Sequence, residues 1–382
     1  MLADVAAAME ELFPARWAEE GDPVGLVVGD PAAEVRRVLF AIDPVQEVVA
    51  EAAASGADLI VTHHPLLFRA VHSVAASTPK GRVVHDLISN GIGLFVAHTN
   101  ADSPPGGVSE SLALALGLHE VRPLDPEPAD PLDKIVTFVP ADDTDAVVDA
   151  LAAAGAGAIG RYDRCAFVSS GEGTFRPGEG ASPAIGTVGR IEVVDERRVE
   201  MVLPRHRRQV VVSALRAAHP YEEPAFDVFE LAAWGSGRGT GRVGRLADPM
   251  SLGDFADLVL DALPPTAVGA RVSGDLETLV TTVGVVGGAG DFMLETARAA
   301  AVDVFVTSDL RHHPASEVRE YVGAPALVDI PHWAAEWTWL PRAAEALTHR
   351  LADVGMDVAC DVSRICTDPW NHRAPSDQRS TP

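Results

Sequence analysis

Two adjacent histidines, His63 and His64, follow the apolar run in the stretch LIVTHHPLLF, residues 59–68. The apolar residues predict a buried strand, so both imidazoles lie just beyond its carboxyl end. Pro65 favours an extended backbone at His64, and neighbouring side chains of an extended chain diverge. One interpretation is a loop with two exposed histidines. The other is a pair of ligands for two neighbouring metal ions, because diverging imidazoles do not easily bind a single ion.

Histidines and carboxylates recur beyond three other predicted strands. The residues concerned are His98, Asn100 and Asp102 around the end of residues 92–99, Asp309, His312 and His313 after residues 302–307, and Asp329, His332 and Glu336 around the end of residues 324–330. In parallel α/β sheets, ligands bind beyond the carboxyl ends of the strands. These side chains are therefore expected to meet at one edge of a sheet.

His332 and Glu336 are four residues apart at the start of a predicted helix. Pro331 favours a helix that begins at this point. The spacing puts both side chains on one helix face, within reach of a common ion. An H-x-x-x-E pattern alone is a weak signal, but its place after a strand end strengthens it.

The predicted metal site contains three histidines and two carboxylates: His63, His64, Asp102, His332 and Glu336. Imidazole and carboxylate suit divalent zinc, manganese or iron. We expect two such ions with Glu336 between them, because a pair about 3.5–4 Å apart is a common arrangement for hydrolysis.

Three residues are predicted to take part in catalysis at this site: Glu336, His98 and His313. The two histidines would transfer protons or support the ligands, and the alternative for each is a hydrogen-bonded structural histidine. Asn100, Asp309 and Thr367 are candidates to orient Asp102, with caps and turns as the alternative. The glycine-rich turn at residues 287–290 could let a phosphate approach backbone amides, although a tight turn needs glycine in any case.

Strands and helices alternate through most of the chain. Predicted strands lie at 36–43, 57–62 and 92–99, and predicted helices at 44–56, 81–91 and 107–118. This order indicates an α/β domain with a mostly parallel sheet. The same alternation resumes in the last third, at residues 276–355, where residues 332–355 predict one long helix.

The middle of the chain follows a different order. Its pattern of strand, helix, two strands, helix and strand predicts a ferredoxin-like α+β insertion. Proline- and acid-rich residues 122–133 and glycine-rich residues 232–241 read as the linkers on either side of it. The predicted domains are an α/β domain in two halves, 1–130 and 239–370, an inserted domain at 131–238, and a disordered tail at 371–382.

Composition excludes several classes of function. The 382 residues carry a formal net charge of -25, which disfavours nucleic acid and anionic lipid as partners. No run of about 18 apolar residues predicts a membrane span. Three cysteines form no C-x-x-C pair, and the first residues lack the basic start of a secretory signal. A cytoplasmic location is the expectation.

The sequence resembles the NIF3 family, whose members are also called GTP cyclohydrolase 1 type 2 homologs. The motifs that carry the resemblance are DPVGLVVGD, VTHHPLLF, AHTNAD, HPYEEPAFDVFEL, VGVVGGAGDFM, DVFVTSDLRHH, DIPHWAAEW and TDPW. The resemblance implies a dinuclear metal site at His63, His64, Asp102, His332 and Glu336. It also implies that the insertion is PII-like or CutA-like and that the chain assembles as a hexameric ring. Two departures, Pro23 after Asp22 and Ser308 before Asp309, affect loops and no predicted ligand.

Three functions fit these features. The first is a metal-dependent hydrolase acting on a nucleotide or a related small molecule. The second is a metal-handling or regulatory protein that does not catalyse a reaction and whose PII-like insertion senses a ligand. The third is a ring-shaped scaffold for partner proteins, with metals that serve stability. The ligand set favours the first two, and the sequence contains no nucleotide signature that separates them.

Overall fold

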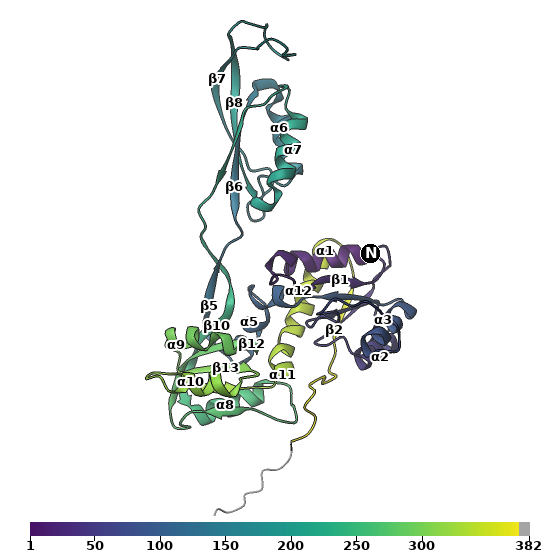
Figure 1. Ribbon diagram of the computed structural model, residues 1–382, viewed down its shortest axis with the longest axis vertical. Coiled ribbons are helices and arrows are strands. Elements are labelled where there is room, and N and C mark those ends of the chain that lie inside the picture. The colour runs from purple at the N-terminus through teal and green to yellow at the C-terminus, as the bar shows by residue number, and fades with distance from the viewer. Residues whose placement is uncertain (374–382) are drawn as a thin grey trace, which may run out of the picture. The chain divides into compact units, whose positions relative to one another are not determined.

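The computed structural model describes residues 1–373, which form two compact units (Figure 1). The main unit comprises residues 1–127 and 237–373, and the inserted unit comprises residues 128–236. Of the predicted disordered tail, residues 374–382 lie outside the described residues. None of the helices within residues 1–373 has the length and apolar character that a membrane crossing requires.

The first sheet of the main unit has five strands in the order β1-β4-β3-β2-β15. Its four neighbouring strands from β4 to β15 are parallel, and β1 pairs antiparallel at the edge. Helices α2 and α3 cover one face through an apolar cluster. The bounds are β1 Gly25–Val28, β2 Arg37–Ala41, α2 Gln46–Ser55, β3 Leu59–Thr62, α3 Pro79–Ser89, β4 Gly93–Val96 and β15 Ala359–Val362.

The second sheet of the main unit has six strands in the order β11-β14-β13-β12-β10-β5. Its centre, β12 to β14, is parallel, whereas β10 and β11 pair antiparallel with their neighbours. Helices α9 and α10 pack on one face. The bounds are β5 His119–Pro128, β10 Gly235–Ser251, β11 Arg271–Ser273, β12 Leu279–Ala289, α9 Leu294–Ala299, β13 Val304–Ser308, α10 His312–Arg319 and β14 Ala326–Asp329.

One apolar core joins the two sheets of the main unit. It contains Phe40 and Val61 of the first sheet, Val285 and Val306 of the second, and the fully buried Trp339. Burial of the apolar surface of these side chains supplies the main stabilisation of the main unit. The helices that contribute to this core or lie beside it are α1 Leu2–Leu12, α4 Thr99–Asp102, α5 Val108–Ala115, α8 Leu252–Ala262, α11 His332–Trp337 and α12 Trp339–Asp353.

A short internal repeat relates the two sheets. Asp58 precedes β3, and its carboxylate accepts hydrogen bonds from the backbone N–H groups of Arg36 and Arg37 at the start of β2. Asp303 precedes β13 and accepts from Thr281 and Thr282 of β12 in the same manner. The similar stretches ADLIVTHHPLLFRA, residues 57–70, and VDVFVTSDLRHHPA, residues 302–315, therefore occupy equivalent positions in the two sheets.

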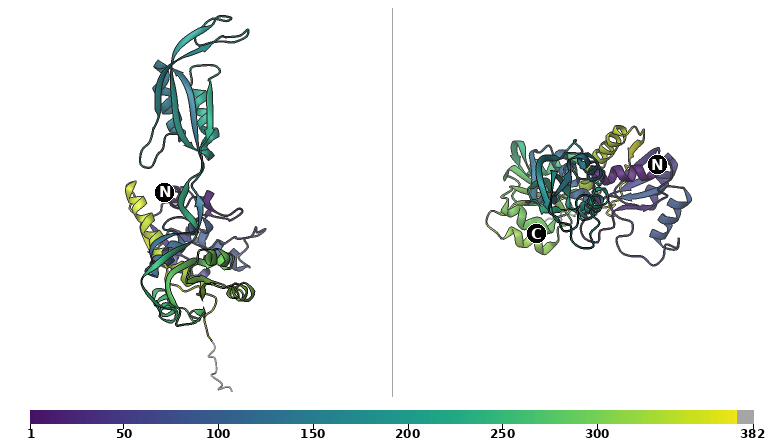
Figure 2. Two further views of the ribbon diagram at one scale, coloured as in Figure 1. Left: turned by 90° about the vertical axis from the view of Figure 1, so that its left-hand side faces the viewer. Right: turned by 90° about the horizontal axis from the view of Figure 1, so that it is seen from above.

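The inserted unit has the element order β6-α6-β7-β8-α7-β9. Its four strands form an antiparallel sheet in the order β7-β8-β6-β9. Both helices lie on one face of this sheet, as Figure 1 and the turned view in Figure 2 show, and they close a separate apolar core. The bounds are β6 Leu132–Pro140, α6 Thr144–Ala153, β7 Phe167–Phe175, β8 Glu192–Pro204, α7 Arg208–Ala218 and β9 Phe226–Glu230.

Several predicted elements differ from the structure. Both predicted linkers are largely strand, because they contribute to β5 and β10, which are neighbours in the second sheet. The prolines of β5 are tolerated because this strand lies at the sheet edge. The sequence predicted a single, mostly parallel sheet for the α/β domain, whereas the structure has two mixed sheets. The predicted helix over residues 332–355 is divided at Thr338 into α11 and α12, and α8 was not predicted.

Candidate metal centre

His63 and His64 lie side by side at the end of β3, with ring centroids 5.2 Å apart. Each ring has its Nδ1 atom engaged. His63 Nδ1 is 2.9 Å from the carbonyl oxygen of Ala97, and His64 Nδ1 is 2.7 Å from a carboxylate oxygen of Asp43. These partners fix both rings and leave each Nε2 atom to face Glu336.

Glu336 is the centre of the cluster, and the residue is only 3% exposed. Its Oε1 lies 2.8 Å from His332 Nε2 and 3.5 Å from His63 Nε2. Its Oε2 lies 2.9 Å from His64 Nε2, but the two atoms are not aligned as a hydrogen bond, so this buried oxygen has no hydrogen-bond partner. A carboxylate surrounded by three imidazole nitrogens can bridge two cations.

Gly288 makes room for this carboxylate. It has φ of +77°, and a Cβ atom there would lie 2.6 Å from Glu336 Oε1. In the same turn, a Cβ at Gly287 would meet Val108 at 2.4 Å, and one at Gly290 would meet Thr307 at 2.3 Å. The glycines of this turn are therefore explained by close packing and by the position of Glu336.

Asp102 completes the predicted set from the short helix α4. Its Oδ1 lies 3.6 Å from His63 Nε2. This oxygen is inaccessible to solvent and has no hydrogen-bond partner, although the side chain as a whole is 37% exposed. The structure thus brings together all five predicted ligands, each within 3.6 Å of another: His63, His64, Asp102, His332 and Glu336.

The partners behind the ligands were largely missed from the sequence. Asp43 was not predicted, yet it holds His64 and in turn accepts a hydrogen bond from the hydroxyl of Thr367. Asp309 holds His332, with its Oδ2 at 2.7 Å from Nδ1. Asp309 and Thr367 therefore orient histidines instead of Asp102. Asp309, which follows the departure at Ser308, thus contacts a predicted ligand.

Asn100 also differs from its predicted role. Its side-chain amide donates to the carbonyl oxygen of Phe13 at 2.6 Å, so it ties α4 to the end of α1. One sequence signal could have identified Asp43 as a supporting residue, namely its position just after a strand. Asp43 follows β2, just as His63 follows β3.

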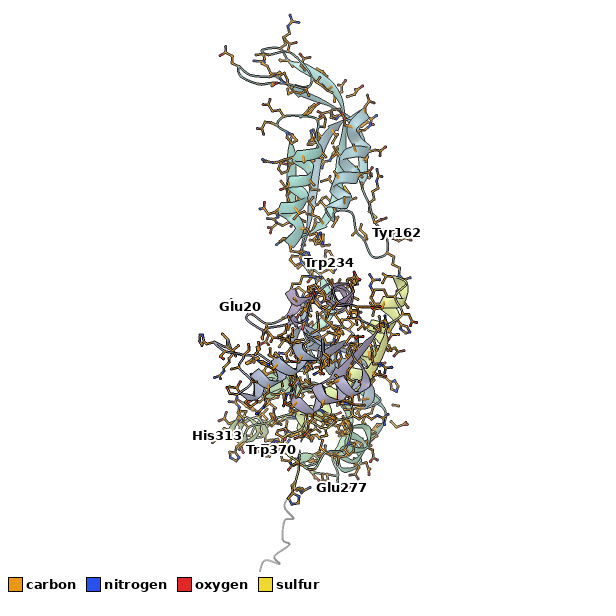
Figure 3. The ribbon with its side chains drawn as sticks, turned by 90° about the vertical axis from the view of Figure 1, so that its right-hand side faces the viewer. Glu20, Tyr162, Trp234, Glu277, His313 and Trp370 are labelled. Atoms are coloured by element: carbon orange, nitrogen blue, oxygen red, sulfur yellow. The ribbon has the colours of Figure 1, made fainter. Side chains whose placement is uncertain are left out.

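The two candidate proton-transfer histidines lie in different places. His98 joins His63 and His64 in a group whose ligand atoms lie within 4.8 Å of one another. Its Nδ1 is 2.9 Å from a carboxylate oxygen of Asp22, which leaves Nε2 available. His313 is exposed on α10 (Figure 3), where its ring packs against that of His312. It belongs to neither group of metal-ligand spacing within residues 1–373.

In the metal-free cluster the pKa values of four ligands are shifted from their usual values. Burial lowers the pKa of His64, but Glu336 and Asp43 outweigh it and raise this pKa to about 11. Burial is likewise outweighed at His332, where Glu336 and Asp309 raise the pKa to about 10. Burial raises the pKa of Glu336, but the neighbouring imidazolium charges hold it well below its usual value. Burial and the charge of Glu336 raise the pKa of Asp102 to about 7.

The residues fit divalent metal ions. Two buried carboxylate oxygens without hydrogen-bond partners, one each on Asp102 and Glu336, face a set of imidazole nitrogens. Two overlapping groups within residues 1–373 have the spacing of metal ligands: His63, His64 and His98, and His64, His332 and Glu336. Without cations, the charge of the buried carboxylates is neutralised by protons on the histidines and in part on Asp102.

Metal binding is expected to release protons. At pH 7 the imidazoles of His64 and His332 are protonated in the metal-free protein, because their pKa values lie above 7. A histidine that binds a metal must be neutral and a carboxylate that binds one must be ionised, so full loading should release about two protons per chain from the histidines and part of one more from Asp102, whose pKa is about 7. The affinity should therefore fall as pH falls. Calorimetric titrations with Zn²⁺ or Mn²⁺ in buffers of different ionisation enthalpy measure this number. Binding without proton release would contradict the charge state described here.

Asp43→Asn is expected to weaken metal binding by about tenfold, because an amide cannot hold His64 as a charged acceptor does. The measurement is metal affinity by competition with a chelating dye. Asp86→Asn is a matched control, since Asp86 accepts from Gln46 on the exposed surface of α2 and α3. Equal affinities for the two variants would show that Asp43 does not orient a ligand.

A cavity of about 780 Å³ opens beside the cluster within the main unit. His64 and His332 form part of its wall. Trp370, which Figure 3 labels, also lines the cavity, as do Arg271 and Arg373. Trp370 is 68% exposed. A small molecule in this cavity would contact the metal ligands, an aromatic ring and cationic groups.

Comparison with known proteins decides the family. The profile of the Duf34/NIF3 family, described as NGG1p interacting factor 3, matches residues 1–369. The chain belongs to the Duf34/NIF3 family. The resemblance found in the sequence motifs is thereby confirmed.

Members of the Duf34/NIF3 family resemble this chain over nearly its whole length. A Mycobacterium tuberculosis protein named GTP cyclohydrolase 1 type 2 homolog is 49% identical over 380 residues, which cover 99% of each chain. A Bacillus subtilis protein of the same name is 37% identical and covers 94% of this chain and 95% of its own. The crystal structure of a Bacillus cereus protein related to NIF3 has a TM-score of 0.80 at 36% identity, and the match covers 97% of this chain and 98% of that one.

Proposed function

We propose that this protein is a metal-dependent hydrolase that binds two divalent ions between His63, His64, Asp102, His332 and Glu336. The observation that carries the proposal is the position of Glu336. This buried carboxylate lies within 3.5 Å of three imidazole nitrogens, and its Oε2 lacks a hydrogen-bond partner. A single proton or ion would leave part of this donor set unused.

The ligands divide between two positions. His64 and His332 lie closest to the two oxygens of Glu336, at 2.9 and 2.8 Å. His63 lies between Glu336 and Asp102. On this basis His64 and His332 would hold one ion, His63 and Asp102 would hold the other, and Glu336 would serve both. Zinc, manganese and iron all suit this set of donors.

Bound divalent ions supply Lewis acidity and lower the pKa of coordinated water toward about 7. The protein's own residues do the rest. Asp43 and Asp309 hold the imidazoles of His64 and His332 in place. His98, held by Asp22, is the residue positioned to accept or donate a proton beside His63 and His64.

The substrate proposed for this site is a nucleotide or a related small molecule. Relatives of this chain are named GTP cyclohydrolase 1 type 2 homologs. The cavity beside the cluster offers Trp370 for stacking on a base and Arg373 for an anionic group, whereas Arg271 is already paired with Asp329.

The test is a turnover assay with metal-reconstituted protein. GTP, other nucleotides and phosphoesters are incubated with the protein, and formate, phosphate and nucleoside products are measured. We expect turnover that disappears with chelator, returns with metal and is absent in Glu336→Gln. Tight metal binding without conversion of any of these compounds would instead favour the alternative, a metal-handling or regulatory protein.

Several finer assignments accompany the proposal. The order β6-α6-β7-β8-α7-β9 and the sheet order β7-β8-β6-β9 support a ferredoxin-like, PII-like inserted domain, with boundaries near residues 131 and 238. Family resemblance supports a hexameric ring and a cytoplasmic protein. Sedimentation analysis tests the assembly, for which a monomer in solution would be the contradicting result.

A further inference from the structure

The motif HPYEE, residues 219–223, builds a hydrogen-bonded network in the inserted unit. His219 is 7% exposed, and its Nδ1 accepts a hydrogen bond from the backbone N–H of Tyr221 at 3.1 Å. Its Nε2 is 3.0 Å from the carbonyl oxygen of Phe138 and must carry the proton. His219 is thus a neutral structural residue that fixes the position of Tyr221.

Tyr221 in turn holds a buried carboxylate. Its hydroxyl donates to Glu196 Oε1 at 2.9 Å, and Glu196 is 8% exposed. Gly173 on the neighbouring strand leaves space for this side chain, since a Cβ atom there would lie 2.0 Å from Glu196 Oε2. Residues from β7, β8 and the HPYEE motif therefore combine to place one carboxylate.

This carboxylate lines a cavity of about 590 Å³ that lies wholly within the inserted unit. The apolar part of the wall includes Phe138, Phe175, Pro177 and Ile185. The ring of Phe175 packs against that of Tyr221 with centroids 5.6 Å apart. A cavity with an aromatic wall and one buried polar anchor is the usual form of a small-molecule site.

The charged residues that line the cavity favour a ligand of positive charge. Four carboxylates line it: Glu172, Glu196, Glu222 and Glu223. The cation among the lining residues is Arg198, which is held by Glu200 and lies over the ring of Phe138. The lining is therefore net negative and disfavours anions such as nucleotides.

The spacing of the carboxylates disfavours a metal ion. The groups within residues 1–373 that have metal-ligand spacing lie in the main unit, and neither includes a residue of this cavity. Glu222 is also engaged, because it accepts a hydrogen bond from the backbone N–H of Ser182. Separated carboxylates around an apolar wall suit an extended organic ligand better than a single ion.

We propose that this cavity binds a small organic cation, an amine or guanidine with an apolar or aromatic body, and that Glu196 is its counter-ion. The aromatic wall takes the body of the ligand by stacking and apolar contact. The cationic group then lies at Glu196, whose position is set by Tyr221 and Gly173. This site is independent of the metal centre in the main unit.

The first test uses the unmodified protein and three probes of similar size: phenethylammonium, 2-phenylethanol and phenylacetate. Calorimetry at pH 7 and low ionic strength is expected to show binding in the order cation, neutral alcohol, anion, with the cation at least about tenfold tighter than the anion. A crystal soaked in phenethylammonium should show the ammonium at Glu196. Equal binding of the three probes, no binding of the cation at millimolar concentration, or binding elsewhere on the chain would overturn the proposal.

The second test uses matched variants. Glu196→Gln keeps the shape of the side chain and should weaken phenethylammonium binding by about tenfold or more, as loss of a charged hydrogen bond does. Glu179→Gln, an exposed change that does not line the cavity, should leave binding unchanged. Glu336→Gln should also leave it unchanged, which separates this site from the metal centre. Unaltered binding in a folded Glu196→Gln protein would refute the assignment.

Discussion

Replacing Glu336 with glutamine is expected to lower the affinity for divalent metal by about 100-fold or more, which corresponds to about 3 kcal/mol. Glutamine keeps the size of the side chain but removes the charge that lies among His63, His64 and His332. The fold should survive, because the buried histidines can release their protons when the counter-charge is lost. Metal content after dialysis and affinity by calorimetry measure the effect.

A matched control for this variant is Glu345→Gln, an exposed glutamate on α12. It should bind metal as the unmodified protein does. If Glu336→Gln retained its full metal content with an unchanged affinity, the carboxylate would not be a ligand and the proposed bridging role would fail.

Arg242→Met is expected to destabilise the main unit by about 3–5 kcal/mol, because it removes the donors of a buried network. Arg242 on β10 is fully buried, and its guanidinium donates to four backbone carbonyl oxygens and to Glu110. Two of the carbonyls belong to Ser103 and Pro104, directly after Asp102. Loss of Arg242 should therefore also loosen metal binding through the loop that carries Asp102.

Denaturant unfolding of the metal-free protein measures this change in stability. The control is Arg245→Met, three residues along the same strand, where the side chain is exposed and the expected change is within about 0.5 kcal/mol. Similar unfolding midpoints for both variants would show that the buried guanidinium network contributes little to the fold.

The candidate ligands could be predicted because histidines and carboxylates, which bind metal ions, lie at or just beyond the ends of predicted strands. A histidine directly beyond an apolar run, as at His63, or an aspartate a few residues further on, as at Asp102, marks the edge of a sheet where sites form. The i, i+4 spacing of His332 and Glu336 survives in the structure because it is local to one helix. Each of these signals lies within a few residues of the ligand, so it can be read without knowledge of the tertiary fold.

The supporting residues could not be predicted because their contacts are set by tertiary packing. Asp43 meets His64 across two parallel strands, and Thr367 reaches Asp43 from 324 residues away. The sequence predicted that Asp309 orients Asp102, whereas in the structure it contacts His332. The sequence does not show that β13 and β14 are adjacent. His312, His313 and Pro314 repeat the His-His-Pro sequence of residues 63–65, yet they lie on helix α10 instead of at a strand end.

The two predicted linkers show how composition can mislead. Proline and glycine favour loops in isolation, but β5 and β10 gain hydrogen bonds in the second sheet. β5 lies at an edge, where a missing N–H is tolerated. The chain therefore enters and leaves the inserted unit through strands β5 and β10 of the second sheet. No local sequence pattern in these two segments indicates that they are strands.

The most direct test of the central claim is a crystal structure of the metal-loaded protein with anomalous diffraction data collected at the absorption edge of the metal. The account predicts two anomalous peaks about 3.5–4 Å apart. One should contact His64 and His332, the other should contact His63 and Asp102, and Glu336 should lie between them. A fully loaded crystal with a single peak, or with metal bound away from Glu336, would contradict it.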